Sequence, residues 1–243
     1  MIAERLDLRA DARANMPELG TVPPALRGAC IATWRARMVN EYSSAVVFDA
    51  LGAQLEATFG AELARECRGF AAEERRHGVL CGAVVEAAGG SATAALLEQP
   101  AFPAHEDAPP RAAALRNAIH VCCMSETVAV ALIGAERLEM PEGPLRRLLT
   151  RIWADEVGHA RFGWRLLEQA GSALTLSERA AVERYLPLAF AHLEAHELSH
   201  LPERAAPEGG ATYGLCSGED GRALFYDTLD RIIRPGLRRW FHC

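Results

Sequence analysis

The sequence contains no lysine, so arginine supplies all 26 of its lysine-plus-arginine positions. A lysine amine is the group that forms a Schiff base with a carbonyl substrate or with pyridoxal phosphate. The chain therefore cannot hold pyridoxal phosphate covalently, and lysine-based imine chemistry is excluded.

An excess of positive charge is also missing. Acidic residues outnumber basic ones by 32 to 26, which gives a net charge of −6 and a pI near 5.8. A nucleic-acid partner is not expected, because proteins that bind nucleic acids carry an excess of basic residues on the binding surface. No uninterrupted apolar run approaches the roughly 18 residues of a membrane span, and residues 1–19 mix charged with apolar side chains. We therefore expect no membrane segment, no secretory signal and a cytoplasmic location.

No Cys-x-x-Cys pair occurs among the seven cysteines. An odd and unpatterned set predicts reduced thiols and not a disulfide framework. Half of the 243 residues are hydrophobic, which is enough for one domain with a large core, or for one core with accessory helices.

What the sequence does contain is a doubled motif, in which a histidine follows a glutamate by three residues. At this spacing the two side chains lie one turn apart on one helix face and can reach the same metal ion. Each motif is directly preceded by a second acid, and a lone glutamate lies further upstream. The residues are Glu41, Glu73, Glu74 and His77 in the first copy, and Glu126, Asp155, Glu156 and His159 in the second.

The spacing within each copy predicts an antiparallel helical hairpin. Glu41 and Glu74 are 33 residues apart, with a midpoint between positions 57 and 58 beside the turn-like Phe59-Gly60. Glu126 and Glu156 are 30 residues apart, with a midpoint in the Pro/Gly-rich break at position 141. Each lone glutamate would then face its partner motif about 24 Å from the turn, at ~1.5 Å per residue. The two hairpins are thus pseudo-equivalent.

The helix faces that carry these glutamates are apolar, as Trp34, Met38, Ala45 and Phe48 around Glu41 illustrate. Carboxylates are rarely buried in such stripes unless they are ion-paired or bound to metal. Four glutamates balance two divalent cations, and oxygen-rich ligation with two imidazoles suits iron or manganese. The alternative is a bundle whose glutamates are solvated or ion-paired.

The arrangement resembles the ferritin-like di-iron carboxylate superfamily, in which one Glu from each of two helices joins a Glu-x-x-His from each of two others. All six positions match, within residues 27–171. The resemblance implies an all-α fold, namely a ferritin-like four-helix bundle with a long crossover and additional C-terminal helices. It also implies two iron ions, or manganese or a mixed Mn/Fe pair. The implied ligands are Glu41, Glu74, His77, Glu126, Glu156 and His159.

Three charged residues beside the motifs are candidate partners of the ligands. Glu73 and Asp155 are placed to accept the second N–H of the ligating histidines. Arg76 fits the pattern Asp/Glu-Glu-x-Arg-His of many di-iron oxygenases, whereas the second copy has Gly158 at that position. Arg76 could equally be a solvated surface residue.

Helical spacing also suggests the walls of an active-site cavity. Trp153 and Phe162 are expected as its aromatic walls, with Met38 and Cys123 near the level of the ligands. Ordinary core packing is the alternative for these residues. Small residues such as Gly163 would leave room for a substrate.

The chain is expected to divide into three parts: an N-terminal arm (1–27), the four-helix bundle (28–171, with the crossover at 89–110), and accessory C-terminal helices that pack on the bundle (172–243). Start and stop signals predict helices at about 28–58, 61–88, 110–138, 143–170, 177–201 and 222–233. The fifth of these carries His192, His196 and His200 at four-residue spacing. That row indicates either a second metal site or delivery path, or simply a polar helix face.

By this resemblance the chain is a non-haem di-iron oxidoreductase, with the di-metal centre itself as the catalytic group. It would activate oxygen or peroxide to oxidise a small organic substrate, with an electron donor as a further partner. The alternatives are an iron-binding or ferroxidase-type protein without an organic substrate, and a metal-binding relic without turnover. Storage ferritins usually lack the second complete Glu-x-x-His, which favours the enzyme. The substrate and a homodimeric state are left open.

Overall fold

The computed structural model describes residues 5–96, 101–201, 203 and 205–242, and it is predominantly helical. In chain order the elements are β1 (Arg5–Asp7), α1 (Arg9–Ala14), α2 (Pro24–Phe59), α3 (Ala61–Ala87), β2 (Thr93–Ala95), α4 (Pro110–Ala118), the π-helix η1 (Ile119–Ser125), α5 (Glu126–Glu139), α6 (Pro144–Gly171), α7 (Leu176–His200), the 3₁₀ turn η2 (Gly210–Tyr213), α8 (Gly218–Thr228), the π-helix η3 (Leu229–Ile233) and α9 (Arg234–Arg238). The all-α prediction is confirmed.

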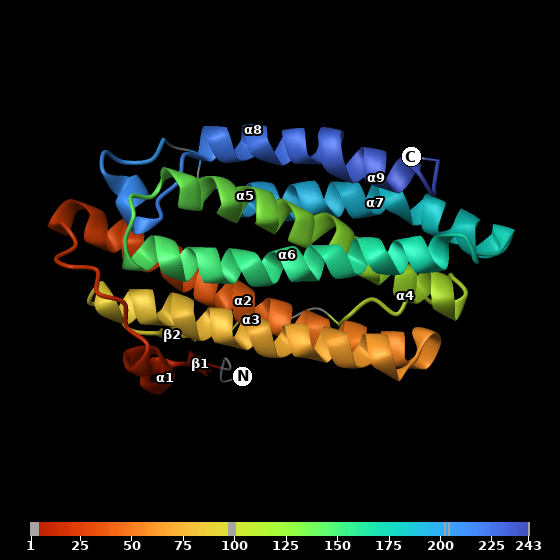
Figure 1. Cartoon of the computed structure of the whole chain (residues 1–243), viewed down its shortest axis with the longest axis horizontal. Helices are drawn as coiled ribbons and strands as arrows, with labels where there is room; N and C mark the ends of the chain where they lie inside the picture. Colours follow the sequence, from red (N-terminus) through yellow and green to blue (C-terminus); the bar gives the residue numbers. More distant parts are fainter. Residues whose placement is uncertain (1–4, 97–100, 202, 204, 243) are drawn as a thin grey trace.

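Two helical hairpins form the centre of the molecule (Figure 1). The first pairs α2 with α3, which are joined by the single residue Gly60 at φ +101°. The second pairs α5 with α6. The connection from α3 to α4 runs from one end of the molecule to the other, so that α3 and α4–α5 run in the same direction (Figure 1). The turns of the two hairpins therefore lie at opposite ends.

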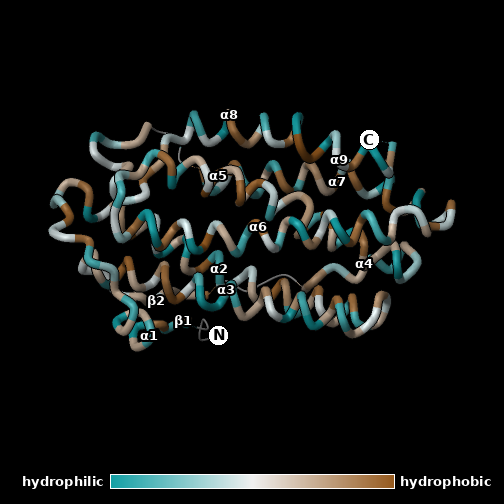
Figure 2. Tube along the Cα trace, in the orientation of Figure 1, coloured by the Kyte–Doolittle hydropathy of each residue, from teal (hydrophilic) through white to brown (hydrophobic). Residues whose placement is uncertain are grey.

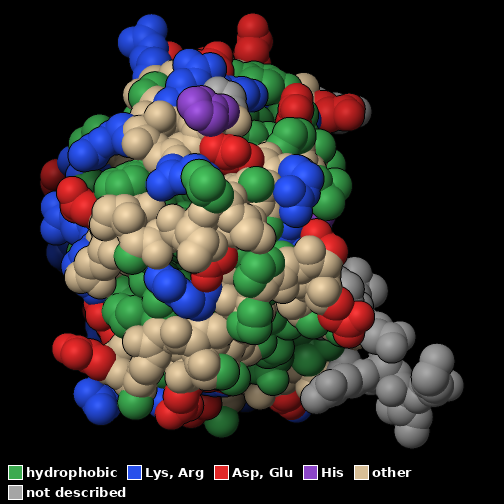
Figure 3. Space-filling view, turned by 90° about the vertical axis from the view of Figure 1, so that its right-hand side faces the viewer, with side chains coloured by type: hydrophobic (Ala, Val, Ile, Leu, Met, Phe, Trp, Pro, Cys, Tyr) green, Lys and Arg blue, Asp and Glu red, His purple; other side chains and the backbone are tan. Residues whose placement is uncertain are grey.

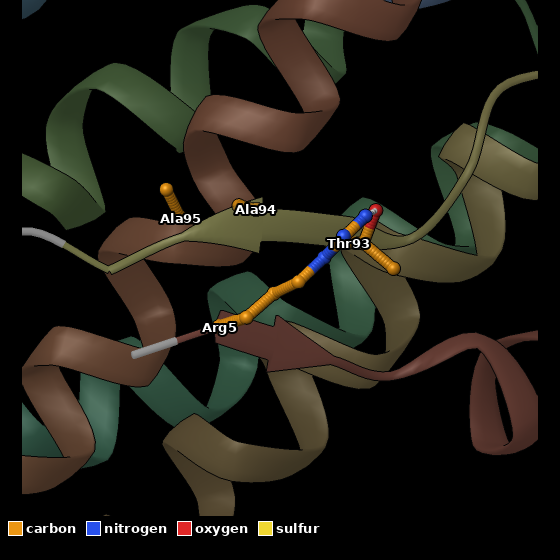
Figure 4. Close-up of a pocket in the computed structure, with 4 residues that line it drawn as sticks. All are labelled: Arg5, Thr93, Ala94 and Ala95. Atoms are coloured by element: carbon orange, nitrogen blue, oxygen red, sulfur yellow. Dashed lines mark hydrogen bonds between the residues drawn. The ribbon is translucent and has the colours of Figure 1, made fainter. Parts of the chain in front are cut away.

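The helix bounds differ from the prediction mainly at the chain ends. Helix α2 begins at Pro24, because a proline in the first turn needs no amide partner. Part of the segment expected as an arm is ordered: β1 pairs with β2, and Arg5 donates to Thr93 Oγ1 at 3.1 Å (Figure 4). At the other end the last helical stretch runs from α8 through η3 to α9 and is longer than expected. The division into three parts stays a prediction.

The C-terminal helices pack on the second hairpin. Helix α7 contacts α4 and η1, and α8 contacts α5, at the edge of the molecule opposite to α3 (Figure 1). Buried Arg116 of α4 donates to the carbonyl of Ala181 on α7 at 2.7 and 3.1 Å. Trp34 of α2 donates to the carbonyl of Tyr213 in η2 at 2.8 Å. These hydrogen bonds tie the last third of the chain to both hairpins.

Apolar and polar positions alternate along α2, α3 and α6 (Figure 2), and the apolar ones fill the interior. On the end face drawn in Figure 3, acidic and arginine side chains are interspersed. Among the described residues, one continuous stretch, Pro110–Glu139, is long and apolar enough to cross a membrane, and 44% of its apolar window is buried inside the protein. The core helix of a soluble protein has the same properties. The buried Glu126 lies within this stretch. The cytoplasmic location stays a prediction.

A π-helical segment sets the position of the second lone glutamate. The seven residues of η1 lie directly before Glu126, which is the first residue of α5. Single π turns inside α-helices occur frequently at functional sites. Helix α6 approaches this segment at Gly163, where an added Cβ would lie 2.5 Å from Cys122 Cβ and 2.9 Å from the Cys123 amide nitrogen. The backbone of η1 thus takes up the space that we expected Gly163 to leave for a substrate.

We predict that Gly163→Ala destabilises the metal-free protein by about 1–3 kcal/mol or more, because backbone atoms cannot move aside for the methyl group. The matched control is Gly158→Ala on the same helix, where a Cβ would meet no atom within 4 Å. This change should be neutral or stabilise by up to about 1 kcal/mol through helix propensity. Urea unfolding measures both; equal stability of the two variants would contradict the close approach.

Candidate metal centre

The six predicted ligands come from four helices that meet in the middle of the bundle. Glu41 lies on α2, the first motif on α3, Glu126 at the start of α5 and the second motif on α6. The side chains of Glu41 and Glu126 are 12% and 9% exposed, and those of the four motif residues at most 3%. The structure therefore buries a cluster of carboxylates and imidazoles in an otherwise apolar interior.

The donor atoms of this cluster form two overlapping groups. In each group the ligand atoms lie within 4.8 Å of one another. Two carboxylates belong to both groups, and each group has one further glutamate and one histidine of its own. The first group is Glu41, Glu74, His77 and Glu156, and the second is Glu74, Glu126, Glu156 and His159.

The two shared carboxylates each face both imidazoles. Glu74 Oε1 lies 3.0 Å from His159 Nδ1, and its Oε2 lies 3.9 Å from His77 Nδ1. Glu156 Oε2 lies 3.0 Å from His159 Nδ1, and its Oε1 lies 3.2 Å from His77 Nδ1. Neighbouring donors around one ion, at roughly 2.1 Å from it, lie about 3 Å apart. The cluster is thus compatible with two adjacent metal ions.

One buried nitrogen makes this fit specific. Among the described residues, His77 Nδ1 has no aligned hydrogen-bond partner, although Glu156 Oε1 lies 3.2 Å away and Glu41 Oε2 lies 3.5 Å away. Leaving a buried polar atom unsatisfied costs free energy. A cation among these donors would remove that cost, so the residues present fit a metal ion at this position.

The acids that precede the motifs orient the histidines, and they do so across the two copies. His77 Nε2 lies 3.0 Å from Asp155 Oδ2, and His159 Nε2 lies 3.0 Å from Glu73 Oε2. Each acid therefore holds the histidine of the opposite motif. Donation of Nε2–H to a carboxylate leaves Nδ1 unprotonated in the neutral ring, and Nδ1 is the atom that faces the cluster.

The arginine next to the first motif takes part in one of these contacts. Arg76 lies 3.4 Å from Glu73 Oε1, and its side chain is half exposed. Position 158 of the second motif is glycine, with open space around its Cα. Arg76 thus accompanies the contact between Glu73 and His159. The second motif has no arginine at the equivalent position to accompany the contact between Asp155 and His77.

The buried charges shift the proton affinities of the cluster strongly. Burial raises the pKa of Glu126 to about 8, and the neighbouring Glu156 carboxylate acts in the same direction. For His77 burial alone would lower the pKa, but the carboxylates of Glu156 and Glu41 outweigh it and raise the value to about 11. The pKa of His159 is raised for the same reason. Without metal, protons therefore balance part of the carboxylate charge.

Aromatic rings surround His159. Its ring centroid lies 4.5 Å from that of Phe70 and 5.1 Å from that of Phe48, and Phe162 packs edge-on against Phe70 at 5.3 Å. The sequence placed Phe48 and Phe70 on the apolar faces around Glu41 and Glu74, but it suggested only Phe162 as a wall of the site. Helical spacing could have identified them as walls, because Phe48 lies two turns from Glu41 and Phe70 lies one turn from Glu74 on the same helix faces.

Two further predicted cavity residues lie elsewhere on their helices. Trp153 is half-buried and turned toward α5, where its Nε1 donates to the Val130 carbonyl at 3.0 Å and Arg137 lies over its ring. Cys123 belongs to the apolar cluster beneath the C-terminal helices, whereas Cys122 packs with the rings near His159. A π turn rotates side chains relative to an α-helix, which spacing of 3.6 residues could not anticipate. The roles of Trp153, Phe162, Met38 and Cys123 as cavity walls stay predictions.

Two cavities that the structure describes lie away from the cluster. One of about 250 Å³ is lined by Arg5, Thr93, Ala94 and Ala95 at the β1–β2 ribbon (Figure 4). The other, of about 470 Å³, lies between α6 and the C-terminal helix and includes Trp164 and Trp240. Neither is lined by any of the six ligand candidates.

Comparisons of the chain with protein-family models, with curated proteins and with solved structures gave no significant match.

We predict that Asp155→Ala lowers the affinity for the ion bound by Glu41 and His77 by about 10–100-fold. This is the usual effect of losing the hydrogen-bond partner of a ligating histidine. The other ion keeps its affinity, because Glu73 still orients His159. Calorimetric titration with Mn²⁺ would show one weakened step and one unchanged step. Glu73→Ala is the matched variant for the other side, and an equal weakening of both steps by either variant would contradict the crossed pairing.

We predict that the metal-free protein loses stability as the pH rises from 6.5 to 8. Folding raises the pKa of Glu126 from 4.5 to about 8 through burial, and the carboxylates of Glu156 and Glu41 raise the pKa of His77 from 6.5 to about 11. Folding thus binds protons, and the stabilisation is lost as they leave. Urea unfolding should show a shallower pH dependence in Glu126→Gln, which stays neutral. Stability that rises over this range in the wild type would contradict the assignment.

Proposed function

We propose that this protein is a ferritin-like di-iron oxidoreductase, which reduces oxygen or peroxide at a metal pair while it oxidises a small organic substrate. The observation that carries the proposal is the doubled donor set, in which Glu74 and Glu156 each face both histidines. A structural ion pair would not need two carboxylates shared between two equivalent groups.

The donor chemistry favours iron or manganese. Each group offers three carboxylates and one imidazole, which is an oxygen-rich set without thiolate. Glu41 and Glu126 would each bind one ion, and Glu74 and Glu156 would link the two. When bound, the metal pair supplies the electrons for the reduction of oxygen, which no side chain of the cluster could supply.

The side chains of the protein hold the site rigid and dry. Asp155 and Glu73 fix the two histidine rings in the orientation that points Nδ1 inward. Phe48 and Phe70 close the side of His159 to water, since they are at most 9% exposed. Exclusion of water strengthens every charge interaction in the cluster.

A second candidate function is iron oxidation or iron holding without an organic substrate. It needs only the donor cluster itself, and no binding site for an organic molecule beside it. In that case ferrous iron would itself be the substrate, and the two positions would fill and empty during turnover. The two candidates differ in whether iron beyond two ions per chain is consumed.

We predict that the metal-free chain takes up two Fe²⁺ without oxygen, and that added oxygen is then consumed in an amount set by those two ions. An oxygen electrode should show that uptake resumes when a chemical reductant is supplied. Ferrous iron in excess of two ions per chain should stay reduced. Glu156→Gln removes a shared carboxylate and should abolish uptake, whereas Glu168→Gln, exposed on the same helix, should leave it unchanged.

Continued oxidation of the excess iron would instead assign the ferroxidase function. Full loading with two ions but no oxygen uptake, with or without reductant, would contradict both functions and leave a metal-binding protein without turnover.

A further inference from the structure

A second group of imidazoles lies outside the carboxylate cluster, where α7 packs on η1. His192 of α7 and His120 of η1 are 72 positions apart in the chain, yet His192 Nδ1 lies 3.2 Å from His120 Nε2. His196 follows one turn after His192, with its ring nearly parallel at a centroid distance of 6.5 Å. Three imidazoles from two elements therefore share one place on the surface.

The spacing of the first two nitrogens matches that of donors to one metal ion. At metal–nitrogen distances of 2.0–2.1 Å, two ligands at a tetrahedral angle have nitrogens about 3.3 Å apart. A hydrogen bond between two neutral imidazoles has a similar length. The separation alone thus admits both, and the third imidazole beside them, that of His196, favours the metal.

His120 lies in a poor environment for a side chain with a purely structural role. Among the described residues its Nδ1 has neither donor nor acceptor, although the atom is buried. The other ring nitrogen, Nε2, faces His192 and is the atom that a metal ion would use, whereas Nδ1 would keep the proton. Burial, reinforced by the neighbouring His192, lowers the pKa of His120 to about 4, and burial with His200 does the same for His196. Near pH 7 both rings are neutral, which is the form that binds metal.

We propose that His120, His192 and His196 form a mononuclear site for a borderline divalent metal such as Zn²⁺, Ni²⁺ or Cu²⁺. His120 and His192 supply two nitrogens in nearly their present positions. His196 is exposed and supplies the third by a change of rotamer, since histidines four residues apart on a helix can chelate one ion. An all-nitrogen set selects these metals, in contrast to the oxygen-rich cluster that suits iron or manganese.

The fourth histidine of the region has a different role. His200 Nδ1 lies 2.8 Å from the carbonyl oxygen of His196 and 3.2 Å from Ser199 Oγ. It thus donates to a carbonyl group in the last turn of its own helix, as basic residues often do there. His200 is the matched control for the site.

The test is calorimetric titration with Ni²⁺ in a chain that carries Glu126→Gln and Glu156→Gln, so that the carboxylate cluster does not compete. One ion per chain should bind. His192→Ala and His196→Ala should each lower the affinity by about tenfold or more, because even outer partners of a ligand have effects of that size. His200→Ala should leave the affinity unchanged. Both replaced ligands are exposed, so circular dichroism should show intact helices.

A second measurement does not depend on calorimetry. One equivalent of Cu²⁺ added to the chain that carries Glu126→Gln and Glu156→Gln should give an electron paramagnetic resonance spectrum with nitrogen hyperfine splitting, and His192→Ala should remove it while His200→Ala should not. Equal Ni²⁺ affinity in the wild-type background and in His192→Ala, or loss of binding in His200→Ala alone, would overturn the site. Failure of iron-dependent oxygen uptake would leave it untouched.

Discussion

The burial of four carboxylates beside two imidazoles is the constraint on which the rest of this structure depends. Glu74, Glu126 and Glu156 are at most 7% exposed in an apolar interior, and such charges are tolerated only with a counter-charge. Without metal, the raised pKa values of His77 and Glu126 mean that protons supply part of it. The four helices are positioned so that these groups meet, and Asp155 and Glu73 hold the two histidines in place.

Much of the candidate site could be predicted from the sequence, because it depends on residue spacing within single helices and hairpins. A Glu-x-x-His on a helix fixes two donors by geometry alone, and the lone glutamates follow from hairpin symmetry. All six predicted ligands lie in one cluster. The helix bounds near the centre were also accessible, since Gly60 and the break before Pro144 are strong stop and start signals.

The remainder depends on contacts between distant segments. Nothing in the sequence says that Asp155 orients His77 and not the histidine of its own motif. The π turn of η1 has no compositional signature, and it moved Cys122 to the place where Cys123 was expected. Gly163 is small enough to border a cavity, but it lies where α6 packs closely against the backbone of η1. These features are decided by tertiary packing, which helical periodicity does not encode.

The crossed pairing of acids and histidines also constrains how the protein assembles. Each hairpin carries two glutamates and one histidine of the cluster. The acid that orients this histidine, Asp155 or Glu73, belongs to the other hairpin. A chain in which only the first hairpin has formed, as during synthesis, has a His77 that is free to turn. The donor set is therefore complete and oriented only once the second hairpin has docked on the first.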